Sequence, residues 1–178
     1  ISLFTLQAIG YFFDVARKKV EAERNLADYM LFVAFFPQIA SGPISKASDL
    51  LPQIKKRREF NYHQATQGLK WLLWGMFLKV VVADNIGEMI AQPLADSASY
   101  SRPTLILSML LYSVQIYGDF AGYSFMALGI GQLLGFELIN NFQRPYLSAS
   151  VTEFWHRWHR SLSIWLKDNI YIPLGGSR

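Results

Sequence analysis

The residues best suited to chemistry lie near the end of the chain, in the stretch from Ser148 to Arg178. This stretch holds two of the three histidines, His156 and His159, and three of the five tryptophans. A neutral imidazole can accept a proton from a hydroxyl group near pH 7, and this step makes an alcohol oxygen nucleophilic. His159 is therefore the candidate catalytic residue.

The sequence predicts a helix around this histidine. Ser150 followed by Glu153 is a capping box, in which the two side chains satisfy N–H groups at the start of a helix. We expect the helix to run from about Val151 to Lys167 and to end before Pro173, because the residue preceding a proline disfavours the α conformation. His159 would share one helix face with Trp155, His156, Leu162, Ser163 and Leu166.

The same helix has a second interpretation. Tryptophans on an apolar face, with a histidine at its margin, are also typical of an amphipathic helix lying at a membrane interface. Residue types and spacing alone favour this interpretation over a catalytic one.

Composition indicates a membrane protein. The chain is 52% hydrophobic and 15% aromatic, and its 17% of charged residues is below the fraction typical of soluble domains. The net charge is +4, but the basic residues flank apolar runs, so nucleic acid is not an expected partner. The chain has no cysteine, which excludes disulfides, thiolate metal sites and a cysteine nucleophile. No metal site is predicted.

Several apolar segments predict helices at membrane depth. Residues 1–15 resemble the end of a membrane helix, followed by basic residues at 17–19. Residues 29–45 are uncharged, contain two prolines and have basic flanks on both sides, which favours a re-entrant hairpin turning at 37–43 over a kinked span. A further helix is expected from Gln64 to Val82.

The longest apolar run extends from Pro103 to Phe136 and contains one charge, Asp119. It exceeds the ~20 residues of one span, so we expect a span over 104–117 and a second segment over 123–134, joined by a bend at Gly118–Gly122. A lone carboxylate in such a run is costly, so Asp119 should face a cavity or pair with a basic residue. The alternative places it on a loop at the water interface.

Four stretches resemble the membrane-bound O-acyltransferase family, and most of all its bacterial branch of alginate O-acetylation and teichoic acid D-alanyl-transfer proteins. They are residues 35–44 (FFPQIASGPI), 115–124 (QIYGDFAGYS), 141–146 (NFQRPY) and 153–178. The last is close to the family's usual sequence pattern, FWRRWHISLSxWLRDYLYIPLGGxR. His159 falls on the histidine of that motif, whereas His156 stands where the family more often has Arg or Asn and receives no role.

The resemblance implies an all-α fold, a multi-span helical membrane protein with a re-entrant or kinked segment and interfacial helices around a funnel or tunnel. The chain begins with Ile1 and ends after Arg178, so we expect a single fragment of such a domain, truncated at both ends. The expected location is the bacterial inner membrane, with several passes.

The implied activity is transfer of an acyl group, usually acetyl, from an intracellular donor to hydroxyls of an extracytoplasmic polysaccharide or cell-wall polymer. The donor would be a co-substrate, acetyl-CoA or an acyl carrier, and no bound cofactor is expected. Expected partners are the lipid bilayer, the donor or its carrier protein, and the polysaccharide. In one variant of this hypothesis, an extracytoplasmic partner transferase passes the acyl group on to the polysaccharide.

The resemblance also implies residue roles. His159 would position or deprotonate the acceptor hydroxyl. The family usually has a second histidine in a later Trp-His-Gly segment, generally held to be the main base, so the fragment alone is expected to be inactive and His159 can be the supporting histidine. Arg157 or Lys167 would hold an anionic part of the donor. The complete set of candidates for binding substrate or donor is Gln115, Asp119, Arg157, Trp158, Ser163 and Lys167.

Two other classes stay open on the sequence. A re-entrant hairpin and a buried carboxylate are also found in transporters and channel subunits. A scaffold that only recruits a separate transferase is the third possibility.

Overall fold

The computed structural model describes residues 3–39 and 42–176, and every regular element in these ranges is helical. The α-helices are α1 (Leu3–Ala16), α2 (Leu26–Val33), α3 (Phe36–Ile39), α4 (Ala47–Lys55), α5 (Tyr62–Met76), α6 (Asp84–Ala95), α7 (Arg102–Leu133), α8 (Val151–Arg157) and α9 (Arg160–Leu166). The π-helical segments are η1 (Phe77–Ala83) and η4 (Lys167–Tyr171), and the 3₁₀ turns are η2 (Ser97–Ser99) and η3 (Pro145–Leu147). The all-α prediction is confirmed.

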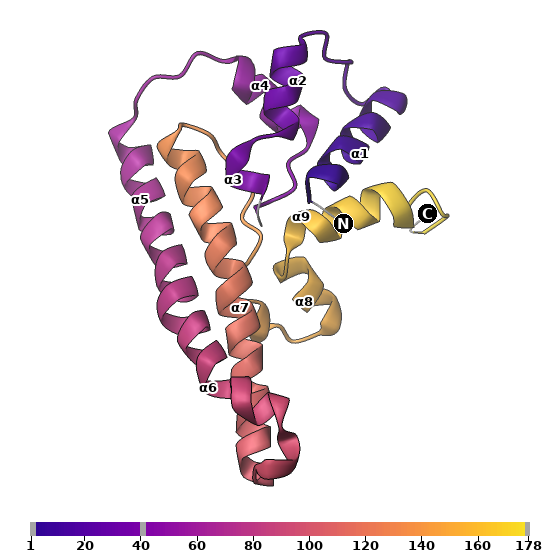
Figure 1. Cartoon of the computed structure of the whole chain (residues 1–178). Coiled ribbons are helices and arrows are strands. Elements are labelled where there is room, and N and C mark those ends of the chain that lie inside the picture. The colour runs from indigo at the N-terminus through magenta and orange to yellow at the C-terminus, as the bar shows by residue number, and fades with distance from the viewer. Residues whose placement is uncertain (1–2, 40–41, 177–178) are drawn as a thin grey trace.

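The frame of the molecule is a long antiparallel pair, α5 continuing through η1 into α6 on one side and α7 on the other (Figure 1). The helix predicted from Gln64 to Val82 is confirmed and extends further at both ends. It begins after Asn61, whose side-chain oxygen accepts a hydrogen bond from the Gln64 N–H at 3.1 Å. Among the described residues, α7 is the one helix long and apolar enough to cross a membrane.

The predicted bend at Gly118–Gly122 is wrong, because α7 is continuous over 32 residues. Its glycines serve close packing instead. A Cβ atom added at Gly122 would lie 2.9 Å from the main-chain oxygen of Gly75 on α5, and one added at Gly129 would lie 2.6 Å from that of Gly68. Small residues at a helix contact let two backbones approach closely, as in membrane helix pairs.

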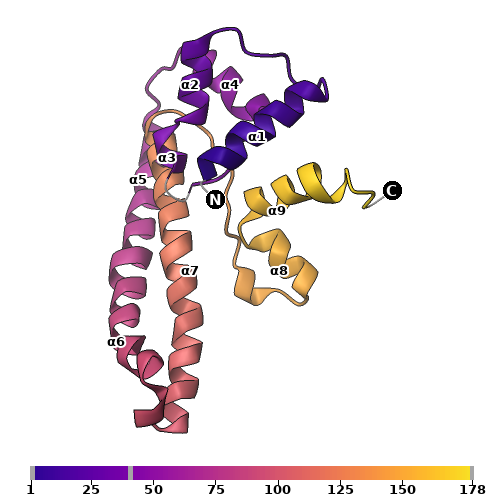
Figure 2. The ribbon, with the colours of Figure 1, turned by 45° about the vertical axis from the view of Figure 1, so that its right-hand side comes forward.

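A second layer lies across one end of this pair, formed by α1, α2 and α4 (Figure 2). Its buried core consists of Phe32, Val33, Phe35, Ala47, Leu50 and Leu51. The predicted interruption of residues 29–45 is confirmed as a break between α2 and α3, with Pro37 in the first turn of α3, where a proline removes no helix hydrogen bond. Residues 40–41 of the expected hairpin turn lie outside the described residues, and its membrane topology stays a prediction.

The chain returns from α7 along the side of the pair, and α8 and α9 pack there (Figures 1 and 2). The side chain of Trp165 on α9 donates a hydrogen bond to the main-chain oxygen of Leu6 on α1 at 2.9 Å. This bond ties the C-terminal segment to the second layer. The helical run then ends at Tyr171, before Pro173 as expected.

Candidate functional site

The single helix predicted from Val151 to Lys167 is wrong: the chain forms two helices with a break at His159. The start is as expected, since the Glu153 N–H donates to the Ser150 hydroxyl at 3.1 Å. At the break, His159 has φ 42° and ψ 55°, the left-handed conformation that residues with a side chain rarely adopt. His159 therefore shares no continuous helix face with Trp155 or the other residues proposed for it.

The break is compensated by the polar connection between α7 and α8. The main-chain oxygen of Asn141 accepts the Arg160 N–H, and its side-chain Oδ1 accepts the Ser161 N–H, both at 3.1 Å. The Gln143 N–H donates in turn to the main-chain oxygen of Arg157 at 3.0 Å. Backbone groups that a continuous helix would have paired thus find partners 14 to 20 residues earlier in the chain.

The ring of His159 is buried, with 3% of the residue exposed. It packs against Phe120 of α7, with ring centroids 4.8 Å apart, and against Phe142 at 6.4 Å. Its Nδ1 accepts a hydrogen bond from the Leu162 N–H at 3.2 Å. Burial among apolar groups lowers the pKa of His159 below its ordinary value, which favours the neutral ring.

The bond to Nδ1 assigns the tautomer of this neutral ring. A nitrogen that accepts an N–H carries no proton, so the single ring proton of His159 is on Nε2. In this state Nε2 is a hydrogen-bond donor. It can take up a further proton only after releasing the one it holds.

Trp158, a predicted site residue, lies in an aromatic cluster that packs α8 against α7. Its ring centroid lies 5.1 Å from that of Phe142 and 5.5 Å from that of Phe154. The other members of the cluster are Tyr117, Phe120 and Tyr146. The structure gives Trp158 a packing position next to the histidine turn.

Three predicted residues, Arg157, Ser163 and Lys167, line one open groove along α8 and α9. Arg157 forms an ion pair with Glu153, and the Ser163 hydroxyl donates to the main-chain oxygen of Trp155 at 3.0 Å. The remaining lining residues are Gln143, Glu153, His156, Arg160 and Ile164. Sequence analysis missed Arg160, although its spacing of three from Arg157 and seven from Lys167 is a detectable signal.

Gln115 and Asp119 lie elsewhere, on the side of α7 that faces η1 and α6. The expected basic partner of Asp119 is Lys79, whose Nζ lies 2.7 Å from the carboxylate and also pairs with Asp84. The Gln115 side chain lies beside Gly87 of α6. The pairing of Asp119 with a basic residue is confirmed.

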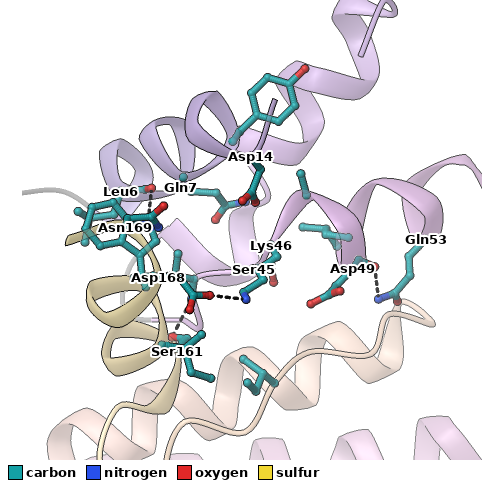
Figure 3. Close-up of a pocket in the computed structure, with 18 of the residues that line it drawn as sticks. Leu6, Gln7, Asp14, Ser45, Lys46, Asp49, Gln53, Ser161, Asp168 and Asn169 are labelled. Carbon is teal, nitrogen blue, oxygen red and sulfur yellow. Dashed lines mark hydrogen bonds and ion pairs between the residues drawn. The ribbon is translucent and has the colours of Figure 1, made fainter. Parts of the chain in front are cut away.

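A separate cavity of about 140 Å³ lies between α1, α4 and α9 (Figure 3). In its lining, the Lys46 Nζ pairs with the Asp168 carboxylate at 2.7 Å, and the Ser161 hydroxyl accepts the Ile44 N–H at 3.0 Å. None of the predicted site residues lines it. Over residues 3–39 and 42–176, no three His, Asp or Glu side chains are grouped to hold a metal ion.

Comparison with known proteins gives consistent matches over the whole chain. Residues 2–178 match the membrane-bound O-acyltransferase (MBOAT) family. The probable alginate O-acetylase of Azotobacter vinelandii is 42% identical over 182 residues, which cover 100% of this chain and 35% of that protein. The peptidoglycan O-acetyltransferase of Helicobacter pylori is 37% identical, covering 100% of this chain and 39% of that protein.

A more distant relative is the teichoic acid D-alanyltransferase of Streptococcus thermophilus, which is 34% identical over 98% of this chain and 43% of its own length. The chain thus spans 35 to 43% of the length of these three relatives.

Proposed function

Because the chain belongs to the membrane-bound O-acyltransferase family, we propose that the full-length protein transfers an acyl group, in the first instance acetyl, to hydroxyls of an extracytoplasmic polysaccharide or cell-wall polymer. The names of the relatives, acetylases of alginate and peptidoglycan and a D-alanyltransferase of teichoic acid, support this reaction class. The donor would be intracellular acetyl-CoA or an acyl carrier. The protein would cross the bacterial plasma membrane several times, with α7 as one span.

The observation that carries the site is the buried turn at His159. We infer a supporting role for it, in which the Nε2–H donates a hydrogen bond to the acyl carbonyl oxygen, where negative charge develops during attack. The Nδ1 bond to the Leu162 N–H holds the ring in the tautomer that this role needs. A different base, the family's second histidine, would accept the hydroxyl proton.

The reaction balances with these roles. The acceptor oxygen forms an ester bond to the acyl carbon, and the bond from that carbon to the donor sulfur breaks. The hydroxyl proton passes to the base and then to the leaving sulfur. One preorganised donor at the carbonyl oxygen contributes about 10²–10³-fold to kcat in other acyl-transfer enzymes.

The groove along α8 and α9 would hold the anionic part of the donor. Arg157, Arg160 and Lys167 line it together with a single carboxylate, that of Glu153. Guanidinium and ammonium groups bind phosphate and carboxylate through charge-assisted hydrogen bonds. Phosphates of acetyl-CoA or an acidic face of a carrier protein both suit this chemistry.

The test uses full-length protein in membrane vesicles with acetyl-labelled donor and purified polymer. We expect ester-linked label on the polymer with wild type and a loss of about 10²–10³-fold with His159→Ala. Wild-type rates in His159→Ala would remove the histidine from the reaction. Solute flux without any labelled product would instead favour a transporter, and labelling only after addition of a separate transferase would favour a scaffold.

A further inference from the structure

Asn141 closes the start of the helix that follows His159. It is fully buried, in the connection between α7 and α8. Its main-chain oxygen accepts the Arg160 N–H and its Oδ1 accepts the Ser161 N–H. These are the first two N–H groups of α9, which a helix cannot pair internally.

His159 completes the same set of acceptors, because its Nδ1 accepts the third N–H of α9, that of Leu162. The first three N–H groups of the helix are therefore taken in order by two groups of Asn141 and one of His159. The left-handed backbone of His159 is strained, and such conformations persist where surrounding contacts hold them. Asn141 supplies two of those contacts.

The neighbouring asparagine shows that this arrangement is particular to position 141. The Oδ1 of Asn140 accepts the N–H of Phe142, two residues along, in a local turn that involves no atom of α9. The Nδ2 of Asn141 is buried and has no hydrogen-bond partner among the described residues. Burying an unpaired amide donor is unfavourable. The favourable contribution of the Asn141 side chain is therefore the hydrogen bond that its Oδ1 accepts from the Ser161 N–H.

We propose that Asn141 is a positioning residue for acyl transfer. It holds the His159 turn so that Nδ1 faces the Leu162 N–H and the ring proton stays on Nε2, where the proposed hydrogen bond to the acyl carbonyl needs it. This rests on the role of His159 proposed above. Asn141 itself touches neither donor nor acceptor, so its loss should affect the chemical step more than donor binding.

The first experiment compares Asn141→Ala with the matched control Asn140→Ala in the full-length protein, with acetyl-CoA as donor. Loss of a group that orients a metal-binding histidine lowers metal affinity or activity about 10–100-fold, and we take the same range for His159. We expect kcat of Asn141→Ala to fall by that factor while KM for acetyl-CoA stays within about 3-fold. Both constants should stay within about 3-fold for Asn140→Ala. Unchanged kcat in folded Asn141→Ala would overturn the proposal.

A double-mutant cycle separates positioning from general damage. If Asn141 acts through His159, adding Asn141→Ala to His159→Ala should lower kcat no further. Multiplication of the two losses would contradict action through the histidine. If His159→Ala alone leaves kcat unchanged, the proposed role of His159 fails; if it lowers kcat and Asn141→Ala does not, only the positioning role fails.

A conservative variant covers the case in which Asn141→Ala does not fold. Asn141→Asp keeps an acceptor oxygen for the Ser161 N–H, and a carboxylate at a helix N-terminus is favoured by the helix dipole. We expect it to retain kcat within about 10-fold of wild type. A folded Asn141→Asp protein that is as inactive as His159→Ala would refute the acceptor role.

Discussion

Replacing Gly129 by alanine tests the close contact between α5 and α7, the helix whose Phe120 packs against His159. The new Cβ would lie 2.6 Å from both the main-chain oxygen of Gly68 and the nitrogen of Leu72. Carbon prefers neighbours at about 3.5–4.0 Å. All nearby atoms belong to backbone, so the helices must separate or bend.

The magnitude follows from comparison with a matched glycine. Gly87 on α6 is also helical, but a Cβ there would lie 3.4 Å from the flexible Gln115 side chain. Both substitutions gain the same helix propensity, roughly 1 kcal/mol, which cancels in the comparison. The remaining difference is the cost of overpacking, about 1–3 kcal/mol. The curated relatives are nearly three times as long as this chain, so 1 kcal/mol corresponds to about 1 °C, and Gly129→Ala should unfold at a Tm lower than Gly87→Ala by about 1–3 °C.

The assay is thermal unfolding of the full-length protein in one detergent, followed by tryptophan fluorescence. Wild type serves as reference, and Gly87→Ala should unfold at or above its Tm. If Gly129→Ala were as stable as Gly87→Ala, the two helices would not be in the close contact described. The assignment of the α7 glycines to packing would then be wrong.

Three further outcomes are expected. Lys79→Met leaves the carboxylates of Asp84 and Asp119 without their shared cation and should lower the free energy of unfolding by about 1–2 kcal/mol. Lys79→Arg keeps the cation and should lower it less. Equal losses of stability in the two variants would contradict the ion-pair account. Burial lowers the pKa of His159, so as the pH falls through about 6.5 the histidine of the unfolded chain takes up a proton before that of the folded protein, and stability falls. The Tm should therefore drop more between pH 7.5 and 5.5 in wild type than in His159→Asn. Parallel curves of Tm against pH would refute this. Arg160→Gln should raise KM for acetyl-CoA about 3–10-fold with kcat unchanged; a fall in kcat alone would place Arg160 outside donor binding.

Local patterns predicted most of the helices, because each depends on neighbours in sequence. The cap at Ser150 and the apolar run of α7 are examples. The helix break at His159 was not predictable in this way. The N–H groups freed at the break are accepted by oxygens of Asn141, which lies about twenty residues earlier in the chain. No local rule places a left-handed histidine between two good helix-forming segments.

Glycine-rich stretches were ambiguous for a related reason. Glycine permits a bend and also permits close packing, and the sequence around Gly122 does not show that Gly75 lies opposite. For Asp119, the cost of a lone carboxylate predicted a basic partner, but only the fold identifies Lys79. The candidate site was therefore predictable as a set of residue types near His159, and its geometry was not.

The proposed role of His159 is tested most directly by acyl transfer in His159→Gln, with His159→Asn as the matched control. Glutamine can place an amide N–H near the position of Nε2, whereas asparagine keeps an acceptor for the Leu162 N–H and tolerates the left-handed backbone but lacks that donor. We predict that His159→Gln retains about a tenth or more of wild-type kcat and that His159→Asn, though folded, falls by about 10²–10³-fold. Equal inactivity of both folded variants would contradict the account, because an amide can donate a hydrogen bond but cannot serve as a base.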